Sequence, residues 1–277
     1  MNYASTYSKQ TVQAFTLASL TRGRLRGKAT FAADSGKAVK VFTNGTAAMN
    51  DYKRTGENRF GTPTDLENTV QELICTRERA FSTVLDGVDG IDLGATQEEA
   101  AAFLRRQIDE VITPEIDAWT LSKLAAACTA DNGNLVTATV TKDNAYSTFL
   151  DACEVLSNAN TPLAGRVAYV SSAFYKAIKQ DASFIKATEL AQDMLVKGQV
   201  GEIDGVAIIM VPAAYMPEGV SCIVMHGEAA CQPIRLEQFN IYPKCQGYSG
   251  PVIEGLVYYD AFVYDARVKS VCAVKTA

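Results

Sequence analysis

Histidine and tryptophan are nearly absent from this sequence: His226 and Trp119 are single residues in a chain of 277. No H-E-x-x-H pattern and no C-x-x-C pair occurs, so the common metal-ligand spacings are missing. The seven cysteines form an odd set, which favours reduced thiols over a disulfide framework. Neither a G-x-x-x-x-G-K-[ST] loop nor a G-x-G-x-x-G turn is present. We therefore predict no bound metal and no cofactor.

Long apolar runs and an export signal are missing as well. The apolar run Val206–Val211 is far shorter than the roughly 20 residues of a membrane helix. The first residues lack a charged region followed by an apolar stretch. A composition with 48% hydrophobic and 21% charged residues is typical of a globular protein with a large core. We expect no membrane contact, and synthesis in the cytoplasm.

Charge is distributed unevenly along the chain. Residues 1–60 contain ten Lys and Arg against three Asp and Glu, whereas residues 61–277 contain 16 against 28. Such a division indicates that the basic region contacts the acidic body of another copy, or an acidic partner. The alternative is a solvated basic surface. The candidate contact residues are Arg22, Arg24, Arg26, Lys28, Lys53 and Arg54.

Titratable residues form no recognisable catalytic set. His226 lies between Cys222 and Cys231, so a thiol–imidazole pair is conceivable, although a lone histidine is more often structural. Glu115 and Asp117 are two positions apart in a helical pattern and cannot face one another. We predict no catalytic residue and no enzymatic activity, with a cysteine-dependent hydrolase as a remote alternative.

The segments 37–42 and 67–85 read as extended strands around a turn-rich polar tip. About 20 extended residues on each side would give an arm of roughly 60 Å. A compact chain of this length has a radius of gyration near 19 Å, so the arm would overhang its own body. The alternative is that the two segments fold back as edge strands of the main sheet.

The pattern from Thr96 to about Cys128 predicts one long amphipathic helix, which Pro114 is expected to bend. Short helices and strands then alternate, with helices at 145–157 and from Ser172 and strands at 166–170 and 221–225. The glycine-punctuated segment 197–205 predicts a turn into the apolar strand 206–212. Residues 255–274 alternate as long sheet strands would, and residues 11–20 suggest a short amphipathic helix.

Five motifs occur in a fixed order along the chain. They are Asp51–Gly56, Arg79–Phe81 with Asp86, Val111–Trp119 followed by Leu121–Ala125, Lys197–Gly205 with Ile208–Pro212, and Ala261–Ala266. Together they resemble the major capsid proteins of tailed bacteriophages, which have the Hong Kong 97-type fold. In that resemblance they correspond to the hairpin tip, the strand returning to the spine helix, the spine helix, an apical strand pair and the last peripheral strand.

The resemblance implies an α+β fold with five parts. These are an N-terminal arm (1–36), an extended hairpin loop (37–86), the spine helix of a peripheral domain (87–133), an apical domain (134–250) and closing strands of the peripheral domain (251–277). Only about 36 residues precede the hairpin, so a fused scaffolding domain is not expected and a separate scaffolding protein is implied. No pair of crosslinking residues can be aligned, and no covalent crosslink is predicted.

The function implied by the resemblance is that of a major capsid protein. Copies would assemble as hexamers and pentamers of an icosahedral shell, with a portal at one vertex and double-stranded DNA enclosed without sequence-specific binding. The protein would be part of the virion after assembly in the host cytoplasm. The alternatives are an encapsulin-type nanocompartment shell and a nucleic-acid-binding module that uses the basic arm.

Overall fold

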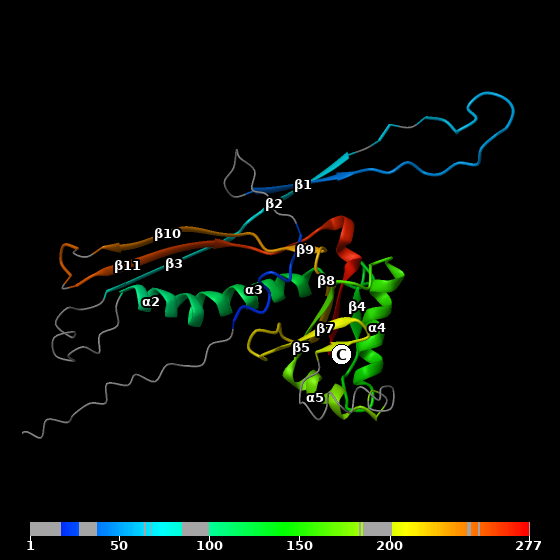
Figure 1. Ribbon diagram of the computed structural model, residues 1–277. Coiled ribbons are helices and arrows are strands. Elements are labelled where there is room, and N and C mark those ends of the chain that lie inside the picture. Colours follow the sequence, from blue (N-terminus) through cyan, green and yellow to red (C-terminus); the bar gives the residue numbers. More distant parts are fainter. Residues whose placement is uncertain are drawn as a thin grey trace, which may run out of the picture.

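A three-stranded sheet runs along a long helix, a six-stranded sheet stands at the end of that helix, and a two-stranded hairpin projects beyond them (Figure 1). This architecture comes from a computed structural model of the chain. It describes residues 18–27, 38–63, 65–66, 68–84, 100–182, 184, 201–242, 245–248 and 250–276.

The six-stranded sheet holds the largest part of the core. Its strands are β4 (Leu135–Thr137), β5 (Arg166–Ser171), β6 (Glu202–Ile203), β7 (Val206–Val211), β8 (Val220–His226) and β13 (Val271–Lys275). They lie in the order β4-β13-β8-β5-β7-β6, with parallel pairing of β5 with β7 and of β13 with β4. The central strands are apolar on both faces, as expected for strands covered from both sides.

Each face of this sheet has its own layer. Helices α4 (Ala145–Asn158) and α5 (Ser172–Gln180) cover one face, in a cluster that includes Ala168 of β5. Helix α3 (Thr113–Ala126) and residues 18–27 cover the other face, in a cluster that includes Tyr169. Neighbouring residues of β5 belong to different clusters because successive strand side chains point to opposite faces.

The expected spine helix is present and contains a wider turn. Helix α2 (Ala100–Gln107) passes into the π-helical segment η1 (Ile108–Ile112) and then into α3. Thr113 donates its N–H to the Ile108 carbonyl, five residues back. Pro114 therefore lies in the first turn of α3, directly after this wider turn, where its ring and missing donor are tolerated. Thr96, the expected helix start, lies outside the described residues.

The three-stranded sheet packs on the spine helix. Its strands are β3 (Arg77–Val84), β10 (Ile234–Tyr242) and β11 (Val252–Tyr259), all antiparallel, with β11 in the middle. Val257 and Tyr259 pack against Ile116 of the helix. Gly255 lies between two phenylalanines, and a Cβ at this position would be only 2.3 Å from the Phe81 ring. Any side chain at this central strand position would therefore force the Phe81 and Phe239 rings to move.

The projecting hairpin consists of β1 (Ala38–Asn44) and β2 (Asn68–Ile74), which pair in antiparallel register with Ala38 opposite Ile74. The prediction of a single strand from 67 to 85 is wrong, because that segment divides at residues 75–76. Its first half pairs with β1 and its second half, β3, joins the other sheet. The described residues between β1 and β2 form an extended loop that reaches well past the body (Figure 1).

Several local predictions differ from the structure. Residues 265–270 form a 3₁₀ helix, η2 (Asp265–Ser270), between the two-residue strand β12 (Phe262–Val263) and β13, so the predicted run of long strands is interrupted. Strand β12 pairs with β9 (Ala230–Cys231). Residues 18–20 are not helical, and the rest of the predicted helix at 11–20 lies outside the described residues.

The turn between β6 and β7 follows the expected chemistry. Asp204 and Gly205 both have positive φ, 49° and 76°, as a two-residue type I′ hairpin requires. The part of the predicted segment before residue 201 lies outside the described residues.

The two main sheets do not divide at the expected domain limits. Strand β10, inside the range expected for an apical domain, pairs with β11 in the three-stranded sheet. Strand β13, expected among the peripheral strands, lies in the six-stranded sheet beside β8. Long-range pairing decides this distribution, and nothing local in either strand indicates it.

One buried carboxylate joins the hairpin base, the spine helix and the end of β11. Asp260 is fully buried, and its two oxygens accept four hydrogen bonds of 2.9 Å. The donors are the N–H and hydroxyl of Thr76, the indole N–H of Trp119 and the N–H of Ala261. Thr76 is the residue at which the chain leaves β2 and enters β3, so Asp260 sets the direction of the hairpin.

We expect Asp260→Ala to lower the free energy of unfolding by about 2 kcal/mol or more, because the Trp119 indole and the Ala261 N–H lose their acceptor at about 1–3 kcal/mol each, while the exposed Thr76 can donate to water. Urea unfolding of the unassembled subunit, followed by the fluorescence of the single Trp119, measures this loss. The matched control is Asp265→Ala, which removes an exposed carboxylate nearby. Equal unfolding midpoints for the two variants would contradict the proposed role of Asp260.

Candidate assembly surfaces

The two faces of the β1–β2 hairpin differ. On the inner face, Val41 and Leu73 pack with Tyr264 and Cys231 of the body. Strand alternation turns Phe42, Val70 and Ile74 to the outer face, where they are 70%, 52% and 58% exposed. Lys40 and Glu72 lie opposite one another on this same face, 4.0 Å apart as an ion pair, between the Phe42–Val70 pair and Ile74. Exposed apolar side chains around one ion pair on an isolated two-stranded ribbon are typical of a surface that contacts another molecule.

The hairpin tip has a defined local structure. Lys53 donates its N–H to the Arg59 carbonyl at 3.0 Å, and the rings of Tyr52 and Phe60 lie 5.2 Å apart. Both rings are largely exposed, as are Lys53 and Arg54 from the predicted contact set. The tip therefore presents an aromatic pair beside cationic side chains.

Residues 18–27 of the basic region lie against their own body. Asp117 of α3 is buried and accepts hydrogen bonds from the Ser19 hydroxyl at 2.8 Å, the Leu20 N–H at 2.7 Å and the Thr21 hydroxyl at 2.6 Å. Gln232 donates to the Thr21 hydroxyl at 2.8 Å and to that of Thr120 at 2.7 Å. The segment is thus held by a network of residues far apart in the chain, which no local pattern indicates.

The end of this segment approaches the turn after β8 very closely. Arg26 and Gly27 donate their N–H groups to the carbonyls of Gly227 and Ala230, at 2.6 and 3.0 Å. A Cβ on Gly27 would lie 2.4 Å from the Ala230 oxygen, and one on Gly227 would lie 2.7 Å from the Arg24 oxygen. Glycine at both positions permits this backbone contact.

The predicted basic contact residues fall into two separate regions. Arg22, Arg24 and Arg26 are exposed on the docked segment, whereas Lys53 and Arg54 lie at the distant hairpin tip. Figure 1 shows the segment beside α3 and the tip at the far end of the hairpin. Lys28 lies outside the described residues.

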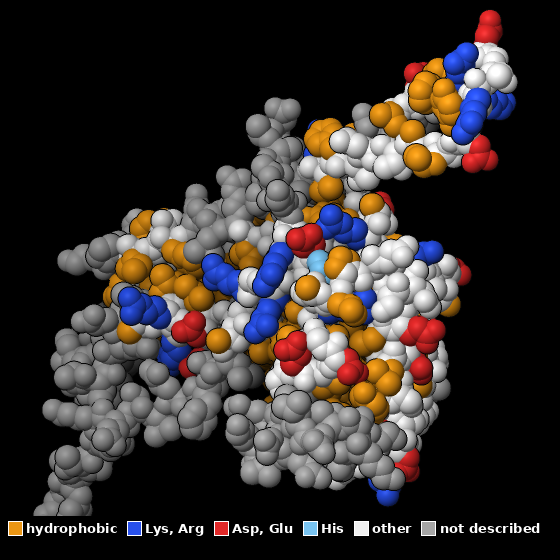
Figure 2. Space-filling model, turned by 45° about the vertical axis from the view of Figure 1, so that its right-hand side comes forward, with side chains coloured by type: hydrophobic (Ala, Val, Ile, Leu, Met, Phe, Trp, Pro, Cys, Tyr) orange, Lys and Arg blue, Asp and Glu red, His pale blue; other side chains and the backbone are white. Residues whose placement is uncertain are grey.

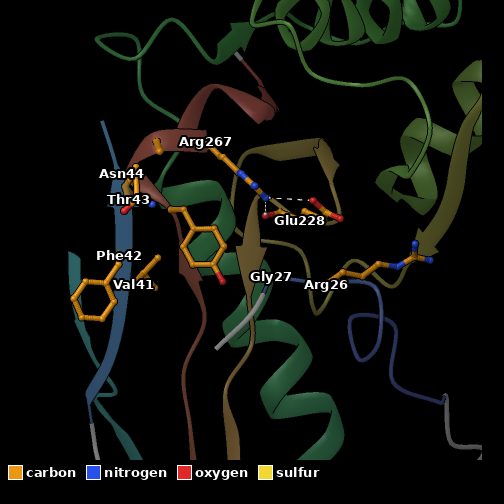
Figure 3. A pocket seen from close by; sticks show the side chains of 10 residues that line it. Arg26, Gly27, Val41, Phe42, Thr43, Asn44, Glu228 and Arg267 are labelled. Carbon is orange, nitrogen blue, oxygen red and sulfur yellow. Dashed lines mark hydrogen bonds and ion pairs between the residues drawn. The ribbon is translucent and has the colours of Figure 1, made fainter. Parts of the chain in front are cut away.

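A pocket of about 510 Å³ separates the segment end from the hairpin base (Figure 3). Val41 and Phe42 border it on the hairpin side, and Arg26 and Arg267 border it on the body side. Arg267 donates to the Glu228 carbonyl at 2.8 Å and lies 3.4 Å from its carboxylate. The Arg26 side chain extends away from the hairpin strand in this view.

The single histidine, His226, is held in place by hydrogen bonds to the backbone. The Glu228 N–H donates to Nδ1 of His226 at 3.3 Å, so Nε2 carries the proton and donates to the Ala164 carbonyl at 3.0 Å. Both ring nitrogens are therefore engaged by the backbone, and neither points to a thiol. Cys222 and Cys231, the conceivable partners, are both buried.

Burial also makes these thiols poor nucleophiles. Loss of solvent raises the pKa of Cys222 well above its ordinary value, and it raises the pKa of Cys231. The same cause raises the pKa of Cys75 to about 11 and that of Cys128 to about 12. An activated thiol needs a lowered pKa, so these cysteines have the opposite character.

Within the described ranges, no group of three or more His, Cys, Asp or Glu side chains is placed to hold a metal ion. Over the same residues, no helix is both long and apolar enough to cross a membrane.

We expect stability to fall as the pH rises above about 9. The buried thiols stay protonated in the folded state, while the unfolded chain loses these protons near the ordinary pKa of 9.0. The unfolded state then binds fewer protons, so the free energy of unfolding decreases by about 1 kcal/mol per fully buried thiol at pH 10.

Urea midpoints at pH 7.5, 9 and 10 measure this loss. Cys222→Ala removes one buried thiol and should make the decline shallower. Val224→Ala truncates a buried neighbour in β8 without removing an ionisable group, and it should lower the midpoint equally at each pH. A wild-type midpoint that does not change with pH would contradict the argument.

Comparison with known proteins gives matches in structure and not in sequence. No protein-family model and no curated protein sequence matches this chain. The capsid structure of cyanophage P-SCSP1u aligns with a TM-score of 0.80 at 12% identity, over 99% of this chain and 93% of that chain. A structure from Mycobacterium phage Che8 aligns with a TM-score of 0.76 at 17% identity, over 98% of this chain and 96% of that chain.

The mature capsid of bacteriophage PhiM1 aligns with a TM-score of 0.72 at 13% identity, over 100% of this chain and 92% of that chain. At such identities the likeness establishes the fold. The α+β prediction is confirmed, and the chain has the Hong Kong 97-type fold of the phage capsid structures that it resembles.

Proposed function

We propose that this chain is the major capsid protein of a tailed phage and assembles into the icosahedral shell of its head. The observation that carries the proposal is the alignment of nearly the whole chain, arm and hairpin included, with phage capsid structures. The projecting hairpin adds physical support, because its outer apolar face needs a surface that the described body does not supply.

In this proposal the hairpin lies over a neighbouring copy and the body forms hexamers and pentamers. The apical domain, expected at 134–250, would face the capsomer centre, while the spine helix and the closing strands at 251–277 would form the peripheral part. Individual contacts can be weak, because each copy in a closed shell makes several of them at once.

The remaining partners follow from the proposed function. A separate scaffolding protein would guide assembly, a portal would occupy one vertex, and the shell would enclose double-stranded DNA without reading its sequence. The protein would be located in the virion after assembly in the host cytoplasm, and it would have no enzymatic role.

Two alternative functions make different predictions from a phage capsid protein. An encapsulin-type shell would have the same fold and enclose protein cargo in place of DNA. A cysteine-dependent hydrolase would need a reactive thiol near His226, and the backbone contacts of that ring argue against it.

Expression of the chain alone, followed by sizing chromatography and negative-stain electron microscopy, tests the proposed function. We expect hexamers, pentamers, tubes or shells, and co-expression with the neighbouring genes should give closed shells where the chain alone does not. Particles filled with DNA support a phage head, and particles filled with a single protein cargo indicate a nanocompartment. A monomer under every one of these conditions would contradict the proposal.

The outer hairpin face generates a second prediction. We expect the triple variant Phe42→Thr, Val70→Thr, Ile74→Thr to lower particle yield at least tenfold. Burial of one such apolar side chain contributes about 1.5–3 kcal/mol, whereas a tenfold change needs only about 1.4 kcal/mol. Threonine keeps the β-propensity of the strands, so the subunit should fold normally.

The matched control is Phe42→Leu, Val70→Ile, Ile74→Val, which keeps an apolar face. Particle yield is measured by sedimentation and subunit folding by urea unfolding. Equal yields from the threonine variant and the control would exclude this face as an assembly contact.

A further inference from the structure

The basic segment and an acidic helix face lie on opposite sides of the six-stranded sheet. Leu25 of the segment belongs to the cluster on the α3 side, whereas Phe149 of α4 belongs to the cluster on the other side. The exposed groups of the two elements therefore point away from one another and cannot meet within one copy.

The three arginines project from residues 18–27, a segment whose backbone is fixed on the body; this surface is called the arginine platform. Thr21 and Leu25 are buried, while Arg22, Arg24 and Arg26 are exposed. The backbone beneath them is fixed by the Asp117 contacts at one end and by the Gly227 and Ala230 carbonyls at the other. Figure 2 shows several Lys and Arg side chains grouped near the middle of the surface that it draws. A platform of this kind loses less conformational entropy on binding than a free tail would.

The outward face of α4 has the complementary charge. Phe149 and Ala152 of α4 are buried in the core. Leu150, Asp151 and Glu154 lie on the opposite side of the helix and are exposed to solvent. Leu150 is 38% exposed. Neither carboxylate makes an ion pair with a cation among the described residues. The face therefore combines a small apolar centre with two carboxylates that have no cationic partner there.

We propose that the arginine platform of one copy docks on the outward face of α4 in the next copy. This inference rests on the proposed function, and it assigns the two surfaces that join neighbouring bodies within a capsomer. Complementary patches on opposite sides of one body make a head-to-tail contact, which closes into a ring when the rotation between copies allows it. A second copy is favoured over another acidic partner because each body supplies one surface of each kind.

The energetics suit reversible assembly. Exposed ion pairs are individually weak, because water screens both charges, and a closed ring combines several of them. The contact is also expected to weaken with added salt, because exposed charges are screened over about 10 Å at 0.1 M ionic strength. A contact of this kind permits correction of misplaced copies before closure.

Charge reversal with rescue tests the pairing. The basic face is reversed by Arg22→Glu, Arg24→Glu, Arg26→Glu and the helix face by Asp151→Lys, Glu154→Lys. We expect each set alone to lower capsomer and particle yield at least tenfold. The chain carrying both sets should return to within about threefold of the wild type, because the reversed faces again have opposite charge. Asp131→Lys, Glu218→Lys is the matched control for the helix set, since it reverses two exposed carboxylates elsewhere on the body.

Each outcome decides the inference. Recovery in the combined variant, with normal yield in the control, supports the pairing. Failure of the combined variant to recover, or normal yield from the helix set, overturns it while the shell function stands. Normal assembly by the arginine set with loss of retained DNA also overturns it and assigns the platform to nucleic acid. A wild type that forms no capsomers under any condition overturns the inference together with the proposed function.

Discussion

The four hydrogen bonds to Asp260 are the constraint on which the arrangement of this protein depends. They join the N–H and hydroxyl of Thr76, the indole of Trp119 and the start of the chain after β11 at one buried point. Arg77, directly after Thr76, lies 3.8 Å above the Trp119 ring. The hairpin therefore leaves the body from a rigid junction, and its direction is set by the helix and sheet that the junction also holds.

The apolar side chains of this protein are well covered in the body and exposed on the projecting hairpin. Both faces of the six-stranded sheet are covered, and one face of the three-stranded sheet is covered by the spine helix. In contrast, the outer face of the hairpin leaves Phe42 exposed over a ribbon of two strands. A fold with a well-packed interior and an apolar projection is suited to a subunit whose remaining contacts come from its neighbours.

Much of the fold was predictable because its signals are local. The helical stripe before Trp119, the apolar strand 206–211 and the Asp204–Gly205 turn all appear where their patterns placed them. The division of the segment 67–85 was not predictable, since both halves have the same alternating pattern and differ only in the strands they pair with. The role of Asp117 in holding residues 18–27 was not predictable for a similar reason, because its hydrogen-bond donors lie almost 100 residues earlier in the chain.

The sequence by itself determined the long helix, the basic N-terminal region and the absence of common catalytic motifs, because composition and periodicity report local preference directly. The α+β class came from the resemblance that the ordered motifs carry. Only the tertiary structure decided that residues 18–27 dock on their own body, that β10 joins the three-stranded sheet and β13 the six-stranded sheet, and that basic and acidic faces lie on opposite sides of one sheet. These features depend on which distant segments meet, and such meetings are set by long-range packing and by buried carboxylates that need donors from several elements at once.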